Sequence, residues 1–85
     1  MKIVMNPIKV YAVCDQNGNI KPISCCLEEN GENIKINLEL QGTEEQKVVG
    51  RIMINFFCRC LLGGCEQVIV LRYDVKEHRW YLYKI

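Results

Sequence analysis

The stretch from Val48 to Cys65 constrains the fold more than any other part of the chain. From Ile52 onward every second residue is apolar, and these residues are Ile52, Ile54, Phe56, Cys58, Cys60 and Leu62. A repeat of two is the period of a β-strand, whose successive side chains point to opposite faces. Gly63-Gly64 ends the run and supplies the positive φ angles that a tight reversal needs. The stretch therefore predicts a long strand that folds back antiparallel onto the residues from Val68 to Tyr73.

Three further segments have alternating faces, and a fourth, at the C-terminus, is predicted to be an aromatic-rich closing strand. They are Ile8 to Cys14, Ile20 to Glu28, Ile34 to Leu40 and Arg79 to Ile85. The dipeptides Asn17-Gly18 and Asn30-Gly31 separate the first three, and Asn-Gly favours a type I′ hairpin turn because both central residues need positive φ. Pro22 lacks a ladder hydrogen-bond donor, which predicts an edge position or a bulge in its strand.

Six strands joined by short turns, with no helical pattern, predict an all-β antiparallel meander. The polar run from Gln41 to Lys47 is expected to be a solvated loop. A chain of 85 residues buries too little surface for two cores, so we expect one domain over residues 1–85. A flat meander would leave two exposed edges, and closure removes such edges. We therefore expect a small β-barrel or a strongly bent sheet, with bends at Gly50 and at Gly63-Gly64.

Charge and hydrophobicity exclude several classes of protein. Eleven basic and ten acidic residues give a net charge of +1, which is too small for a dedicated nucleic-acid binder. The N-terminal residues lack the apolar run of a secretory signal, and nowhere are there eighteen consecutive apolar residues. We therefore expect a cytoplasmic protein that does not associate with membranes and that keeps its thiols reduced.

The six cysteines allow a packing interpretation and a metal interpretation. Alternation places four of them on core faces, where a free cysteine acts as a small hydrophobic residue: Cys14, Cys25, Cys58 and Cys60. A zinc site would draw its four ligands from Cys58, Cys60, Cys65 and either Cys26 or Cys25. The Cys-x2-Cys spacing typical of such sites is absent, so packing is favoured and no cofactor is expected. Cys26 and Cys65, on an outer face and beside a turn, are the thiols most open to reaction.

The C-terminal segment combines aromatic and basic residues. The candidate binding surface consists of Tyr73, Arg79, Tyr81, Tyr83 and Lys84. Aromatic rings beside basic groups can stack the bases of single-stranded nucleic acid, as small barrels do. The near-neutral net charge instead favours an interpretation in which Trp80 and Leu82 fill the interior while the tyrosines cover its end.

No catalytic constellation is evident. His78 is the only histidine, and nothing in the sequence places a nucleophile within hydrogen-bond reach of it. Glycine-rich phosphate-binding motifs are also absent. We therefore do not expect an enzyme.

Three segments resemble a group of small uncharacterised proteins of Clostridium-type Gram-positive bacteria. They are P-I-K-V-Y-A-V-C-D-Q-N-G-N-I-K-P-I at Pro7 to Ile23, F-C-R-C-L-L-G-G at Phe57 to Gly64, and R-W-Y-L at Arg79 to Leu82. The resemblance implies an all-β fold, and it brings no activity and no functional residue. This chain is also richer in cysteine than that group, which argues against treating cysteine as the group's shared site.

The favoured interpretation is a non-catalytic interaction module of otherwise unknown function. It would bind a protein partner, or its own copy as a homodimer, through an exposed strand edge or the tyrosine-rich surface. A single-stranded nucleic-acid-binding barrel and a cysteine-ligated zinc module are the alternatives.

Overall fold

The computed structural model describes residues 1–85, and every element in it is a β-strand. The strands are β1 (Ile3–Pro7), β2 (Lys9–Cys14), β3 (Ile20–Glu29), β4 (Glu32–Asn37), β5 (Glu39–Val48), β6 (Arg51–Leu62), β7 (Cys65–Asp74) and β8 (Arg79–Lys84). All paired strands are antiparallel. The predicted all-β antiparallel class is therefore confirmed. The chain contains no helix of the length and apolarity that a membrane crossing requires.

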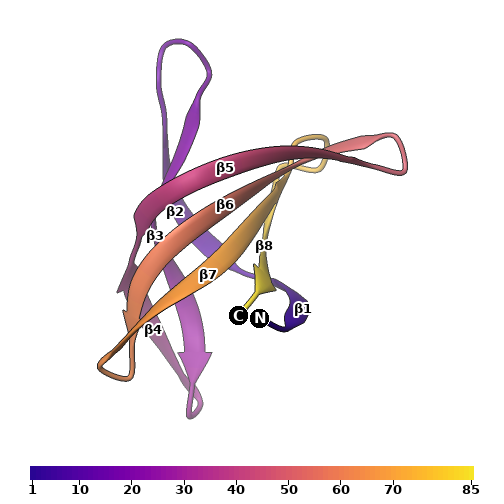
Figure 1. Ribbon diagram of the computed structural model, residues 1–85. Coiled ribbons are helices and arrows are strands. Elements are labelled where there is room, and N and C mark those ends of the chain that lie inside the picture. Colours follow the sequence, from indigo (N-terminus) through magenta and orange to yellow (C-terminus); the bar gives the residue numbers. More distant parts are fainter.

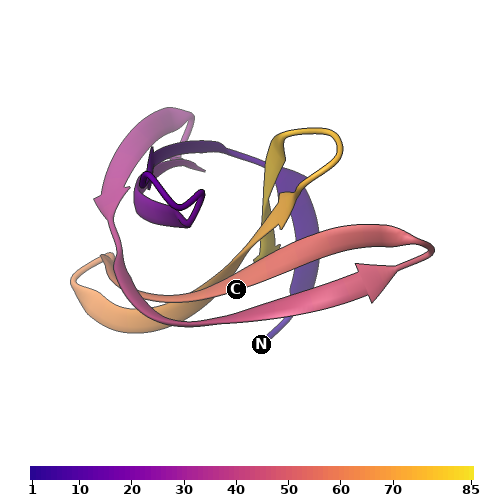
Figure 2. The same cartoon turned by 90° about the horizontal axis from the view of Figure 1, so that it is seen from above.

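The strands form two sheets that wrap around a shared interior (Figures 1 and 2). One sheet has five strands in the order β1-β8-β7-β6-β5, and the other has three in the order β2-β3-β4. Only Ile8 separates β1 from β2, and only Leu38 separates β4 from β5. The Ile8 amide donates to the carbonyl of Trp80, and the Leu38 amide donates to the carbonyl of Ile23. The chain therefore passes from one sheet to the other at these two residues.

The predicted number of strands and the predicted closed barrel were both wrong. There are eight strands, and neither sheet is closed into a barrel. The breaks at Ile8 and Leu38 divide two extended segments, so each half pairs in a different sheet and closure is lost. The strand β1 was not anticipated. It has a bulge between Ile3 and Asn6 and pairs with β8.

The polar run Gln41 to Lys47 is part of strand β5, so the predicted loop was wrong. Its ladder to β6 runs from Gly42 opposite Phe57 to Val48 opposite Arg51. Nearly all of its side chains are exposed, so the run has no apolar periodicity. This strand forms because β6 offers a row of backbone partners, and such pairing needs no buried face.

The core lies between the two sheets. Its buried members are Cys25, Ile36, Phe56, Cys58, Cys60, Ile69, Leu71 and Leu82. The predicted alternation of β6 holds from Ile54 to Leu62. It is wrong at Ile52, whose side chain is 43% exposed, while Met53 is buried. Ile52 lies beyond the last pair between β6 and β7, Met53 with Asp74, so its only strand partner is Lys47 of β5.

Two of the predicted reversals are confirmed. Asn30 and Gly31 have φ angles of 52° and 78°, and they join Glu29 directly to its partner Glu32. Gly63 and Gly64 have φ angles of 57° and 78°. Both loops have two residues with positive φ, as a type I′ turn requires.

The turn after β2 differs from the prediction because Asp15 organises it. Only Gly18 has a positive φ, 83°, so Asn17-Gly18 is not a type I′ turn. The Asp15 carboxylate accepts hydrogen bonds from the Asn17 and Asn19 amides, at 2.8 and 2.9 Å. The Asp15 carbonyl accepts a third bond from the Gly18 amide. These bonds close a longer loop and hold the carboxylate at the end of the strand.

A bulge next to Pro22 confirms the prediction made for that residue. Tyr11 pairs with Ser24 and Ala12 pairs with Pro22, which leaves Ile23 without a partner on β2. The extra residue reverses the alternation of β3, so Ile23 is exposed and Ser24 is buried. Ile23 therefore does not share the inner face of Cys25, as a regular alternation would require.

The turn between β5 and β6 places a β-branched residue in a strained conformation. Val49 and Gly50 have φ angles of 49° and 77°, and Val49 is 96% exposed. Gly50 is therefore a turn residue and not a bend within the strand. A β-branched side chain disfavours positive φ, and nothing packs on Val49 to compensate.

Replacing Val49 by asparagine is expected to raise the free energy of unfolding by about 1 kcal/mol, because asparagine tolerates this conformation. Urea denaturation followed by circular dichroism measures the change. Val75→Asn is the control, since Val75 is also an exposed turn valine but has no positive φ. A Val49→Asn variant no more stable than the parent would contradict the strain argument.

Candidate interaction site

The most open strand edge of the molecule belongs to β2. The edge strands of the two sheets are β1, β5, β2 and β4. Proteins protect such edges with charges, prolines and bulges. The edge strand β1 has a bulge and Pro7, β4 contains Glu32 and Lys35, and β5 carries several charges. From Val10 to Cys14, β2 has no charge, proline or bulge of its own.

The apolar side chains of β2 are exposed to solvent. Tyr11 is 42% exposed and Val13 is 56% exposed, and Ala12 and Cys14 are also exposed. Only Val10 packs partly against the core. Figure 1 shows why: the hairpin of β2 and β3 projects away from the rest of the molecule. Its far end is a two-stranded ribbon, because the ladder of β4 to β3 begins only at Ser24.

The two ends of this edge carry opposite charges. Lys9 begins β2, and its ammonium group lies 5.2 Å from the centre of the Tyr11 ring. Lys35 of β4 lies 4.7 Å from the same ring. Asp15 follows β2, and hydrogen bonds from the backbone and side chain of Asn19 lower the pKa of its carboxyl group. Asp15 is therefore negative at neutral pH, opposite in sign to Lys9.

Sequence reasoning identified this strand but did not single out Ala12 or Val13. The signal was the uncharged run V-Y-A-V-C at Val10 to Cys14. Such a run forms an accessible edge if β2 is an edge strand and is covered if β2 is a central strand. Only the pairing order of the strands decides between the two.

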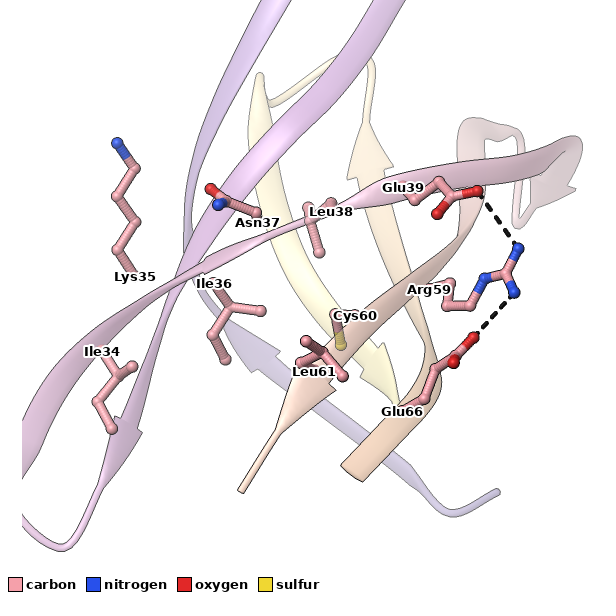
Figure 3. A pocket seen from close by; sticks show the side chains of 10 residues that line it. All are labelled: Ile34, Lys35, Ile36, Asn37, Leu38, Glu39, Arg59, Cys60, Leu61 and Glu66. Atoms are coloured by element: carbon pink, nitrogen blue, oxygen red, sulfur yellow. Dashed lines mark hydrogen bonds and ion pairs between the residues drawn. The ribbon is translucent and has the colours of Figure 1, made fainter. Parts of the chain in front are cut away.

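A second surface feature is a groove between β4 and the end of β6 (Figure 3). Its volume is about 620 Å³, and its lining consists of Ile34, Lys35, Ile36, Asn37, Leu38, Glu39, Arg59, Cys60, Leu61 and Glu66. The groove opens because the pairing of β5 with β6 ends at Glu39 opposite Arg59. Arg59 binds Glu39 at 3.3 Å and Glu66 at 2.8 Å, as Figure 3 shows. The one arginine of the groove is therefore paired with both carboxylates of its lining.

Comparisons of the chain with protein-family models, curated proteins and solved structures found no match. Function is therefore inferred from the geometry of these surfaces.

The outer face of the five-stranded sheet holds a buried arginine. The Arg72 guanidinium lies 3.5 Å from the centre of the Tyr83 ring. Its Nε donates to Asn55 Oδ1 at 2.8 Å, and one terminal nitrogen donates to Gln46 Oε1 at 2.7 Å. Arg72 is 6% exposed. It therefore serves to cover the sheet, and it occupies a face of the Tyr83 ring that a nucleobase would need.

The predicted aromatic surface is divided between two faces of the sheet. Tyr73 packs against Trp80 at 4.8 Å between ring centres, on the side of the core. Tyr81 lies opposite Arg72 on the outer face. Tyr83 and Lys84 are adjacent there, whereas Arg79 is exposed at the start of β8. The five candidate residues thus form no continuous surface. The interior positions predicted for Trp80 and Leu82 are confirmed.

Three cysteines are buried, and three are not. The burial predicted for Cys25, Cys58 and Cys60 is confirmed, and Cys65 is exposed as expected. The burial predicted for Cys14 was wrong, because Cys14 is the last residue of β2 and is exposed. Cys26 is half-buried.

The structure gives no support to the zinc interpretation. No group of three or more cysteine, histidine or acidic side chains is placed to hold a metal ion. Cys58, Cys60, Cys65 and Cys26 therefore do not converge. His78 lies in a turn, where its Nδ1 is 3.1 Å from the Tyr73 hydroxyl, so its neighbour is a phenol and not a thiol.

We expect the thiols to react in two groups with iodoacetamide at pH 8. Burial raises the pKa of Cys25 to about 12 and that of Cys58 to about 11, so both remain unreactive thiols. Cys14 and Cys65 are exposed and should be alkylated at least tenfold faster. Mass spectrometry of peptides after timed labelling measures the rates. The same labelling in urea is the control, and rapid modification of Cys25 in the folded chain would contradict its burial.

Proposed function

We propose that the protein is a non-catalytic interaction module that binds an extended protein segment by adding it as a strand to the free edge of β2. One observation carries this proposal: of the four edge strands, only β2 offers an exposed run without a charge, a proline or a bulge of its own, from Val10 to Cys14. In strand addition the backbone hydrogen bonds supply affinity, and alternate side chains supply specificity. Tyr11 and Val13 supply apolar contacts on one face, and Ala12 and Cys14 supply them on the other.

The nucleic-acid alternative receives less support from the arrangement of charges. Arg51 and Arg59 are each paired with two carboxylates, so neither is free to bind phosphate. Arg72 is buried against Tyr83. A single-strand binder needs a basic groove lined with accessible rings, and these residues do not supply one. Strand addition requires neither feature.

A synthetic peptide of alternating threonine and valine, with lysine at each end, tests the proposal. We expect the peptide to slow amide hydrogen exchange within β2, because the outward amides of a free edge have no partner. Val13→Lys should weaken binding at least tenfold, since a charged side chain on an edge discourages pairing. NMR at increasing peptide concentration measures both effects.

Val68→Lys is the matched control, because Val68 is also a strand valine, 46% exposed, and lies on β7. It should leave binding unchanged. Protection that appears at another edge, or equal binding by the Val13→Lys variant, would refute the assignment to β2.

A further inference from the structure

We infer that the strand accepted by β2 is β2 of a second copy of this chain, in an antiparallel pair centred on Ala12. This inference rests on the proposed function, since it names the partner of the same edge. It draws on the order of residues along the edge. Centring on Ala12 places Tyr11 opposite Val13 of the second copy, and Val10 opposite its Cys14. At each end it places Lys9 opposite Asp15.

The faces of the strand agree with this register. Directly opposed residues in an antiparallel pair lie on the same face of the sheet. With Ala12 at the centre, odd-numbered residues oppose odd-numbered residues and even-numbered residues oppose even-numbered ones. Each face of one copy therefore continues as the same face of the second copy. A pair centred between two residues would instead place odd-numbered residues of one copy opposite even-numbered residues of the other. Unlike faces of the two strands would then meet.

Several registers place like faces of the two strands together. The charges of Lys9 and Asp15, at the two ends of the edge, favour the register centred on Ala12. Centring on Tyr11 would place Lys9 opposite Val13, and centring on Val13 would place Asp15 opposite Tyr11. Only the pair centred on Ala12 joins opposite charges at both ends. The Asp15 carboxylate is already held in place by the Asn17 and Asn19 amides. Exposed ion pairs contribute little affinity, so their role here is to set the register.

The size of the contact predicts weak association. Six residues of β2 on each side are far fewer than the roughly 20–30 per side of a standard protein interface. We therefore expect a dimer whose population depends on concentration. The hairpin projects from the body of the molecule (Figure 1), which leaves room for a second hairpin beside it. The result is one continuous sheet in the order β4-β3-β2-β2-β3-β4 across the two copies.

Disulfide formation at introduced cysteines tests the register. The background variant carries serine at Cys14, Cys26 and Cys65, so that only buried thiols remain. In it, Ala12→Cys places two thiols directly opposite each other, with Cα atoms about 4.5–5.5 Å apart. A disulfide spans this separation. Under oxidised glutathione this variant should form at least tenfold more covalent dimer than the background.

Val13→Cys in the same background is the matched control. The two copies of residue 13 each oppose residue 11, so they are offset by two positions, or about 7 Å along the strands. That offset lies beyond the reach of a disulfide. Equal crosslinking of the Val13→Cys and Ala12→Cys variants would overturn the register.

Sedimentation of the unmodified chain separates this inference from the proposed function. We expect a monomer–dimer equilibrium that Val13→Lys weakens at least tenfold and Val68→Lys leaves unchanged. A chain that stays monomeric at millimolar concentration, while the threonine-valine peptide still protects β2, overturns self-pairing and leaves strand addition intact. A chain that stays monomeric and also does not bind the peptide overturns both self-pairing and strand addition.

Discussion

Replacing Phe56 by alanine is expected to lower the free energy of unfolding by about 3–5 kcal/mol. Phe56 is 2% exposed and lies on β6, the second strand from one edge of the five-stranded sheet. Its ring packs at 5.2 Å from that of Trp80, and its strand neighbours are Leu71 and Thr43. Truncation removes apolar contacts and leaves a cavity that a small core cannot refill. Because the free energy of unfolding of a small domain is only about 5–15 kcal/mol, the variant should lose much of its stability.

Urea denaturation at 25 °C, followed by the fluorescence of Trp80, measures this loss. Phe57→Ala is the control, because Phe57 is the neighbouring residue, lies on the outer face and is only half-buried. It should cost less than half as much. Equal losses for the two variants would mean that the inner and outer faces of β6 have been assigned incorrectly.

Raising the pH from 9 to 11 is expected to destabilise the protein by a few kcal/mol through its buried thiols. Burial raises the pKa of Cys25 to about 12 and of Cys58 to about 11, and it also raises the pKa of Cys60. The unfolded chain ionises these groups near pH 9, while the folded chain keeps them protonated. The folded state then binds more protons, so stability falls as pH rises, by at most about 1.4 kcal/mol per pH unit for each thiol. Below pH 9 this contribution is constant.

Denaturation midpoints at pH 7, 9, 10 and 11, in the presence of reductant, measure the decline. Cys25→Ala is the informative variant: it should be less stable than the parent at pH 7 but should lose less stability between pH 9 and 11. All other groups are common to both proteins, so their contributions cancel in the comparison. Parallel pH profiles would show that Cys25 does not retain its proton in the folded chain.

The sequence predicted those parts of the fold in which burial imposes a period. Phe56, Cys58 and Cys60 alternate because one face of β6 covers the core. Strand β5 was missed because its exposed faces can hold any polar residue, as at Glu44 and Glu45. Its existence depends on pairing with β6, which the local sequence does not encode.

The candidate site was only partly predictable for a similar reason. The strand from Ile8 to Cys14 was expected, and β2 lies within it. Whether the apolar residues of β2 are buried depends on the order of the strands. After the break at Ile8 the chain enters the three-stranded sheet, in which β2 is an edge strand. Cys14 is exposed for the same reason, because it lies on this edge strand. The aromatic candidates are divided because Tyr73 on β7 packs against Trp80 on the side of the core, whereas Tyr81 on β8 lies opposite Arg72 on the outer face, and this arrangement depends on the pairing of β7 with β8.

The two chain ends form a pair of backbone hydrogen bonds, from Lys2 to Ile85 at 2.9 Å and from Ile85 to Lys2 at 3.0 Å. Figure 1 shows both ends together, far from the turn that joins β2 to β3. A fluorescent tag or a surface tether fused at either end therefore leaves the apolar edge accessible. A short linker joining the ends, with a new opening between Val49 and Gly50, would give a circularly permuted chain with both sheets intact.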